Sequence, residues 1–115
     1  KGADKVFDFA QYLHHQGTAE LALCMLDDYT QDNHQQLDNL MAAIKAHNIE
    51  AAQLAVAALA LNGDILCAQT LKRLCAQWSN LLNSSKLSNC VDNVDVLYQE
   101  TCVALQAIDE YAETV

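Results

Sequence analysis

The stretch Asn48–Ser79, NIEAAQLAVAALALNGDILCAQTLKRLCAQWS, decides the fold of this chain. It predicts two helices joined by a turn at Asn62-Gly63-Asp64, where Gly63 ends the first helix and Asp64 caps the second. From Ile49 to Leu61, apolar residues cover most of the predicted helix circumference. One side of this helix can therefore pack in a core while another side still presents alkyl surface. We expect it to be the central helix or to contact a partner.

Length and composition favour a single helical domain that spans residues 1–115. The chain has no proline and three glycines, so few positions interrupt a helix. A chain of this length can bury roughly two-thirds of the surface that it exposes when unfolded, without help from metals or disulfides. The sequence therefore predicts one helical domain with its own core.

Two helices are predicted on the N-terminal side of this stretch. The first is short, covers residues 5–13 and is followed by Gly17, a natural helix end. Thr18 can cap a long second helix, in which we expect a kink or a partly hydrated turn at Asn33-His34. The apolar side of the first helix comprises Val6, Phe9, Ala10 and Leu13. The stripe of the second comprises Ala22, Met25, Leu26, Tyr29, Leu37, Leu40, Met41 and Ile44.

Two more helices follow the predicted turn. The fourth helix ends near residues 83–85, and Ser88 or Asn89 can cap the fifth. Their apolar stripes comprise Leu71, Leu74, Cys75, Trp78, Leu81 and Leu82 in the fourth, and Val91, Val94, Leu97, Tyr98, Cys102, Leu105, Ile108 and Tyr111 in the fifth. Amphipathic helices with short connections predict an all-α fold, an antiparallel up-down four-helix bundle with the short N-terminal helix across one end.

Charge and hydropathy argue against two classes of partner. Fifteen acidic residues against six basic ones give a formal charge of -9, which repels phosphate backbones and anionic lipid headgroups. Polar residues interrupt every apolar run well before the ~20 residues that a membrane-spanning helix requires. We therefore expect no nucleic-acid partner and no direct membrane contact.

The cysteines favour a reducing compartment. They are odd in number, and most lie among apolar helical positions: Cys24, Cys67, Cys75, Cys90 and Cys102. We interpret them as reduced packing residues of a cytoplasmic protein. The chain begins Lys1-Gly2-Ala3 without methionine, so we expect it to be part of a longer protein. A membrane anchor elsewhere in that parent is compatible with this interpretation.

The order of the helices resembles the histidine phosphotransfer (HPt) domain family. A short helix, a long helix that opens Gly17-Thr18-Ala19-Glu20-Leu21, a compact third helix and then Leu71-Lys72-Arg73-Leu74-Cys75 follow that family's pattern over almost the whole chain. The resemblance implies a phosphorelay signalling domain whose partner is the receiver domain of a response regulator. It also implies a parent sensor histidine kinase, anchored in the inner membrane by other segments.

The third predicted helix keeps the spacing of the family motif but not its reactive residues. The motif is His-x-Leu-Lys-Gly-Ser, followed by a second glycine six residues after the first and a leucine four residues later. With that leucine at Leu71, the histidine position is Ala57 and the second glycine position is Cys67. The other motif positions hold Leu59, Ala60, Leu61 and Asn62. A methyl group has no lone pair to attack an aspartyl phosphate, so the resemblance implies a domain without its usual phosphoacceptor.

Two alternative functions stay open. A shifted register aligns the stretch from Ala46-His47 with the motif, and the chain would then be a competent phosphotransfer domain that uses His47. That register reverses the charge at the motif lysine to Glu50 and displaces the match at residues 71–75 by ten positions. The other alternative is a helical dimerisation module outside signalling.

The remaining polar residues predict no metal site, no cofactor and no enzymatic activity. His14 and His15 are neighbours at a helix end, where side chains diverge, and no third ligand lies at a zinc-like spacing. His34 and His47 have ordinary structural interpretations. The acidic residues have no adjacent base or glycine-rich loop that would suggest acid–base catalysis.

The third predicted helix does present a candidate binding face. We expect Ala52, Ala55, Val56 and Leu59 to form its buried side. Leu54 and Leu61 lie one turn on either side of Ala57, where the resembled family exposes its histidine, and Glu50 and Ala58 form the edge. Each leucine would gain about 1.5–3 kcal/mol on full burial. We expect these five residues to bind a receiver domain or, in a homodimer, a second copy of the chain.

Overall fold

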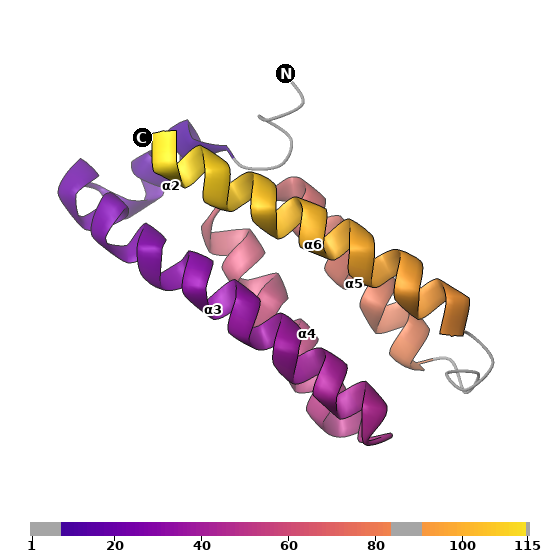
Figure 1. Ribbon diagram of the computed structural model, residues 1–115. Coiled ribbons are helices and arrows are strands. Elements are labelled where there is room, and N and C mark those ends of the chain that lie inside the picture. The colour runs from indigo at the N-terminus through magenta and orange to yellow at the C-terminus, as the bar shows by residue number, and fades with distance from the viewer. Residues whose placement is uncertain (1–7, 84–90, 115) are drawn as a thin grey trace.

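The computed structural model describes residues 8–83 and 91–114, and this part of the chain is helical without a β-strand. The all-α prediction is therefore confirmed for the described residues. Figure 1 shows the five helices, which are α2 (Phe9–Gln16), α3 (Ala19–Lys45), α4 (Ile49–Ile65), α5 (Gln69–Asn83) and α6 (Val91–Thr114). The predicted caps Ser88 and Asn89 lie outside the described residues.

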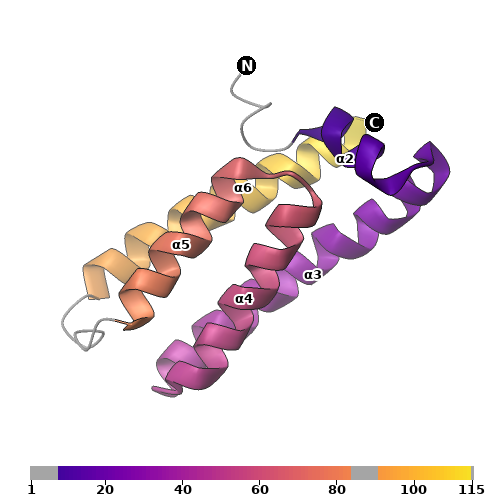
Figure 2. The same ribbon diagram turned by 180° about the vertical axis from the view of Figure 1, so that it is seen from behind.

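Four long helices pack in a ring around the core. Helix α4 packs against α3 and α5, and α6 contacts both α5 and α3, so the ring closes (Figures 1 and 2). The molecule is elongated, with principal extents of 45 × 26 × 19 Å. Within the described ranges, none of the helices combines the length and the apolarity that a bilayer span requires. The largest fully buried side chains are Trp78, Tyr12, Leu40, Leu59, Leu66, Leu71, Leu74, Leu105 and Ile108.

The predicted N-terminal caps of the two central helices are confirmed. The Thr18 side-chain oxygen accepts a hydrogen bond from the backbone N–H of Leu21 at the start of α3. The Asn48 side chain accepts one from Ala51 at the start of α4. Each cap satisfies an N–H that the first helical turn would otherwise leave unpaired. Gly17 ends α2, as predicted, with φ of 88°.

The predicted turn at Asn62-Gly63-Asp64 is wrong. Helix α4 continues through these residues to Ile65, and Asp64 is part of it rather than a cap for α5. Gly63 is buried in the contact with α5, where an added Cβ would lie 3.1 Å from the Cγ of Lys72 and 3.4 Å from that of Leu71. The glycine is therefore needed for close helix packing and not for a turn.

Both ends of α4 are bounded by left-handed residues that are not glycine. His47 (φ 56°) follows α3, and Cys67 (φ 58°) follows α4. The N–H of Ala68, which follows Cys67, donates to the backbone carbonyl of Gly63, 2.8 Å away. The N–H of Cys67 donates to the backbone carbonyl of Asp64. The same pattern follows α3, and it pairs carbonyls that the last helical turn leaves open.

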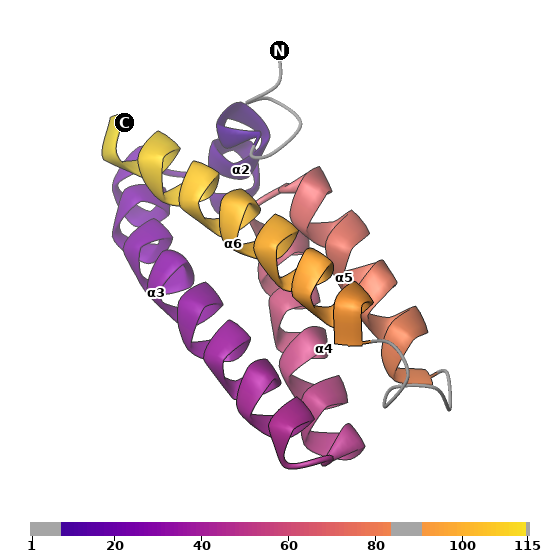
Figure 3. The same ribbon diagram turned by 45° about the vertical axis from the view of Figure 1, so that its right-hand side comes forward.

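Helix α2 packs at the end of the bundle where α4 turns into α5. The Asp8 N–H donates to the carbonyl of Cys67, and the hydroxyl of Tyr12 donates to the carbonyl of Ala22 in α3 at 2.6 Å. Burial, and next the neighbouring Tyr29, raise the pKa of Tyr12 to about 12. The buried residue of α2 is thus Tyr12, and the predicted core residue Ala10 is exposed. Figure 3 shows α2 beside the C-terminal end of α6.

The polar centre of α3 is buried rather than hydrated. Asn33 is 0% exposed, and its side-chain oxygen accepts a hydrogen bond from the Asn62 side chain at 3.0 Å. The same Asn62 amide also donates to Asp32 at 2.8 Å. The expected hydrated turn at this point is therefore wrong, because α3 runs without a break from Ala19 to Lys45 and Asn33 is buried against α4. His34 points outward and pairs with Asp109 of α6.

A second buried polar link joins α5 to α6. The indole N–H of Trp78 donates to the hydroxyl of Thr101 at 3.0 Å, and that hydroxyl donates to the carbonyl of Leu97 at 2.7 Å. Both side chains are 0% exposed. A hydrophobic substitute at Thr101 would leave the indole N–H without its hydroxyl acceptor in a place that excludes water.

We predict that Thr101→Val lowers the free energy of unfolding by about 1–3 kcal/mol, because the buried indole N–H loses its acceptor. Thr101→Ser keeps the hydroxyl and should lose less, about 1 kcal/mol for one buried carbon. Urea unfolding followed by the fluorescence of Trp78, the single tryptophan, measures both. A Val variant as stable as the wild type would contradict this account.

Candidate functional site

Helix α4 buries one side and exposes the other. Its buried side comprises the predicted residues Ala52, Ala55, Val56 and Leu59. Because alanine is small, α3 and α5 can both approach α4 closely on this side. Among residues 8–83 and 91–114, no helix covers the opposite side, and its side chains are exposed.

The five predicted binding residues share this outer side, which we name the α4 face: Glu50, Leu54, Ala57, Ala58 and Leu61. Leu54 is 73% exposed and Leu61 is 59% exposed, which are high values for leucine. Glu50 and Ala57 are exposed, and Ala58 is half-buried at the edge. The predicted exposure of the two leucines is therefore confirmed, and they form an apolar ridge two helical turns long, while their role in binding stays a prediction.

The α4 face has no histidine, cysteine, lysine or hydroxyl side chain. Position 57 presents a methyl group, and α4 contains no histidine, lysine or arginine. The neighbouring Cys75 of α5 is buried, and burial raises its pKa to about 12, so its thiol stays protonated at neutral pH. The α4 face therefore lacks the histidine that the resembled family uses as phosphoacceptor.

A groove of about 290 Å³ runs between α4 and α5 beside the α4 face. We name it the α4–α5 groove; it is lined by Gln53, Val56, Ala57, Ala60, Lys72, Cys75, Ala76 and Ser79. Lys72 is the one charged residue in this lining. Its ammonium lies 3.2 Å from a carboxylate oxygen of Asp64, and both side chains are well exposed to solvent.

His47 precedes α4, at the end of the helix that carries Glu50. It is exposed, left-handed and located in the turn before Asn48, ten positions before Ala57. At a rise of 1.5 Å per residue, ten positions correspond to roughly 15 Å along the helix axis. His47 is therefore close in sequence to Glu50, at one end of the α4 face, and far along the helix from Ala57.

The other histidines have local partners or lie in solvent. His34 pairs with Asp109 across α3 and α6, and the His15 ring nitrogen Nδ1 lies 3.7 Å from the Sγ of Cys67. Burial first, and then the carboxylates of Asp8 and Asp64, raise the pKa of the Cys67 thiol. In the described part of the chain, no three histidine, cysteine or acidic side chains converge as a metal would require. Cys24, Cys67, Cys75 and Cys102 are free thiols, and Cys90 lies outside the described residues.

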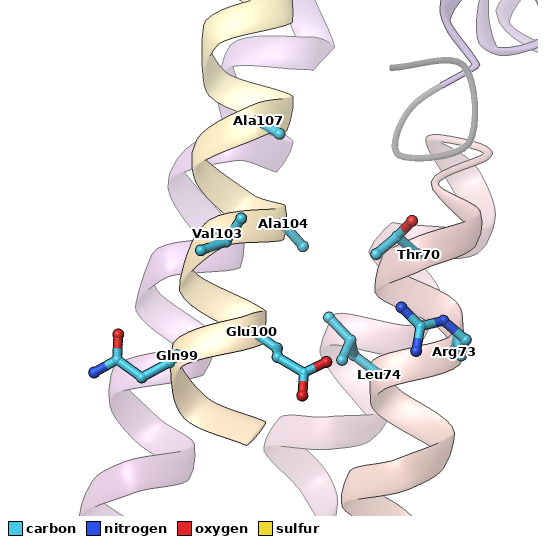
Figure 4. A pocket seen from close by; sticks show the side chains of 8 residues that line it. All are labelled: Thr70, Arg73, Leu74, Gln99, Glu100, Val103, Ala104 and Ala107. Carbon is cyan, nitrogen blue, oxygen red and sulfur yellow. The ribbon is translucent and has the colours of Figure 1, made fainter. Parts of the chain in front are cut away.

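The sequence analysis missed a second groove, between α5 and α6. This α5–α6 groove has a volume of about 340 Å³ and is lined by Thr70, Arg73, Leu74, Gln99, Glu100, Val103, Ala104 and Ala107. Figure 4 shows Arg73 and Glu100 on opposite walls. Val103 lies outside the predicted apolar stripe of α6, and its side chain is 68% exposed. The signal for this groove in the sequence was Val103, an apolar residue off the predicted stripe and near Ala104 and Ala107.

Comparison with known proteins gives no relative. No protein family, no curated protein and no solved structure matches the chain.

We predict that Leu54→Gln and Leu61→Gln together change the free energy of unfolding by no more than about 0.5 kcal/mol per site, because both side chains already face water. Leu59→Gln, on the buried side of the same helix, is the matched control and should lower the free energy of unfolding by about 2–5 kcal/mol. Thermal melts followed by circular dichroism compare the variants. A comparable loss in both would show that the α4 face is part of the core.

Proposed function

We propose that this chain is an HPt-like phosphorelay domain that docks a receiver domain through the α4 face without accepting a phosphoryl group. The observation that supports this most strongly is the coincidence, on one exposed helix side, of an apolar ridge and a methyl group at the position of the family histidine. Leu54 and Leu61 provide the ridge, and Ala57 provides the methyl group. The domain thus binds and regulates; it is not an enzyme.

The backbone at Cys67 supports the alignment that places Ala57 at the histidine position. In that alignment Cys67 stands where the family has its second glycine, and its φ of 58° is a left-handed conformation that glycine adopts without strain. The shifted register through His47 would place the second glycine at Ala57, in the middle of α4. Ala57 is a residue inside α4, whereas Cys67 adopts the left-handed conformation that favours glycine, and this difference supports the first alignment.

The pairing of the long helices supports an antiparallel up-down bundle, the finer architecture of the resembled family. Asn62, near the end of α4, bonds to Asn33 of α3, and Asn48, near the start of α4, bonds to Ala43 at the end of α3. Late residues of α4 thus lie beside earlier residues of α3, as in an antiparallel pair. Two short turns join α3 to α4 and α4 to α5. We propose that α5 and α6 continue this alternation.

The residues around Ala57 explain why binding would occur without transfer. Ala60 carries no charge at the position of the motif lysine, which would offset negative charge that develops during transfer. Leu61 fills the position of the first glycine, where the family leaves room for the receiver domain to approach. A receiver domain would then contact a leucine ridge in place of a reactive histidine.

We place the domain in the cytoplasm, as part of a parent sensor kinase that other segments anchor in the inner membrane. The four free thiols among the described residues fit a reducing compartment. The formal charge of -9 disfavours nucleic acid and anionic lipid as partners.

Self-association is the second candidate function. The same ridge of Leu54 and Leu61 would be buried as well by a second copy of the chain, and this would give a homodimer. Sedimentation analysis over a range of concentrations separates this outcome from receiver binding.

We predict that the chain binds a receiver domain but takes no phosphoryl group from its phosphorylated form, because Ala57 offers no nucleophile. Ala57→His alone should stay inactive, since Leu61 still obstructs approach. The triple change Ala57→His, Ala60→Lys, Leu61→Gly restores the nucleophile, the charge and the space, and should accept acid-labile phosphate. Radiolabel transfer from the phosphorylated receiver measures all three proteins.

His47→Ala serves as the control for this experiment in both the wild type and the triple variant. Label on the wild type that disappears with His47→Ala would overturn the proposal and favour a competent domain that uses His47. A triple variant that folds, binds a receiver and still accepts no phosphate would show that Ala57 is not the histidine position.

A further inference from the structure

The outer side of α6 presents an apolar row, which we name the α6 row: Val96, Val103 and Ala107. The side chains of Val96 and Val103 are 58% and 68% exposed. They are seven positions apart, so they lie on the same side of α6, two helical turns from each other. Ala107 follows Val103 by one turn and is half-buried. A partner that covers this row removes apolar surface from water.

The α5–α6 groove continues the α6 row inward. Figure 4 shows Val103, Ala104 and Ala107 on α6, and Thr70 and Leu74 across the groove on α5. Leu74 and Ala104 are buried, so the base of this groove of about 340 Å³ is apolar. Because Val103 is mostly exposed, a small molecule in the groove would stay in contact with water. A helix laid along α6 fills the groove with its side chains and also covers the row outside it.

The charges around the α6 row are mainly acidic. Every charged residue of α6 is an aspartate or a glutamate. Glu100 lines the groove, and Glu110 lies seven positions after Val103 on the same side of the helix; both are exposed. Arg73 on the opposite wall is the one basic residue of the lining. With a formal charge of -9 for the whole chain, a cationic partner is attracted, and its positive charges are favoured on the α6 side of the groove.

We propose that the α5–α6 groove and the α6 row bind an amphipathic helix of a partner protein that carries lysine or arginine along the edge facing α6. Apolar side chains of that helix enter the groove beside Val103, and its basic side chains approach Glu100 and Glu110. From Val96 to Glu110 the surface extends over about 21 Å, which corresponds to roughly four turns of the partner helix. This inference goes beyond the proposed function, which concerns the α4 face, and does not depend on it.

A second copy of the chain fits this surface less well. Two copies with a formal charge of -9 repel each other. If α6 packed against α6 of another copy, Glu100 and Glu110 would face further carboxylates across the contact, and like charges at an interface oppose association. Charge complementarity therefore favours a basic partner helix.

Two synthetic peptides of about four helical turns test this inference by calorimetric titration of the 115-residue chain. Both peptides contain the same leucine, lysine, alanine and glutamine residues and have the same net positive charge. The first has its leucines at helical spacing with lysines beside them, and the second has the same residues in an order that scatters the leucines. At about 150 mM salt, the first should bind at least about tenfold more tightly. Equal affinities would overturn the inference, because net charge alone would then explain binding.

Variants of the chain locate the binding surface. Val103→Gln should weaken binding of the first peptide about fivefold, because it removes an apolar contact. Glu100→Gln should weaken it about two- to fivefold and reduce its sensitivity to salt, whereas Arg73→Gln should strengthen it about twofold. The Leu54→Gln, Leu61→Gln double variant is the matched control, since it removes exposed apolar side chains from the α4 face. It should change the affinity less than about twofold.

The outcomes separate this inference from its alternatives. A loss of affinity in the α4-face double variant as large as that in Val103→Gln would overturn it, because the peptide would then bind exposed leucines as well. Weaker binding by Arg73→Gln would contradict the expected charge pattern. A dimer in sedimentation analysis that dissociates with Val103→Gln would assign the groove to a second copy instead. Receiver domains take no part in these measurements, so this inference and the proposed function can fail independently.

Unfolding curves verify that each variant keeps the fold. Val103 and Glu100 are exposed, so their substitution should change the free energy of unfolding by no more than about 0.5 kcal/mol. A loss of peptide binding with unchanged unfolding then reports the surface itself.

Discussion

The left-handed turn at Leu66–Ala68 is the constraint on which the rest of the bundle depends. The N–H groups of Cys67 and Ala68 close the end of α4, the carbonyl of Ala68 accepts the N–H of Lys72 in α5, and the carbonyl of Cys67 accepts the N–H of Asp8 before α2. One tripeptide therefore ends α4, starts α5 and holds α2 at the end of the bundle. A non-glycine residue in this conformation costs of the order of 1–2 kcal/mol, which the surrounding hydrogen bonds and packing must offset.

This turn also determines what α4 can offer to a partner. It brings α5 close enough for Lys72 to lie over Gly63, and α3 packs on the other flank through the buried Asn33–Asn62 link. Because α3 and α5 occupy both flanks, the alanine-rich side of α4 is buried. Leu54 and Leu61 remain exposed on the other side. In our proposal, the exposed side of a phosphotransfer scaffold thereby keeps a binding surface after the reactive residues have gone.

The sequence predicted the helices, the caps at Thr18 and Asn48 and the exposed leucine ridge, because these depend on local hydrogen bonds and on a period of 3.6 residues. It misplaced the α4–α5 turn, since Gly63 serves packing and no propensity marks Cys67 as left-handed. Contacts between distant segments, such as the Asn33–Asn62 hydrogen bond, could not be predicted from the sequence either. The two grooves and the position of Lys72 follow from how helices meet, which no single stretch of sequence encodes.

Amide chemical-shift mapping of the ¹⁵N-labelled chain during titration with a receiver domain tests the central claim most directly. The account predicts that the largest perturbations fall on the outer residues of α4, from Glu50 to Leu61, and extend to Lys72 on α5. Perturbations centred on the turn at His47, or on the α5–α6 groove around Arg73 and Val103, would contradict it, because binding would then use a surface other than the α4 face.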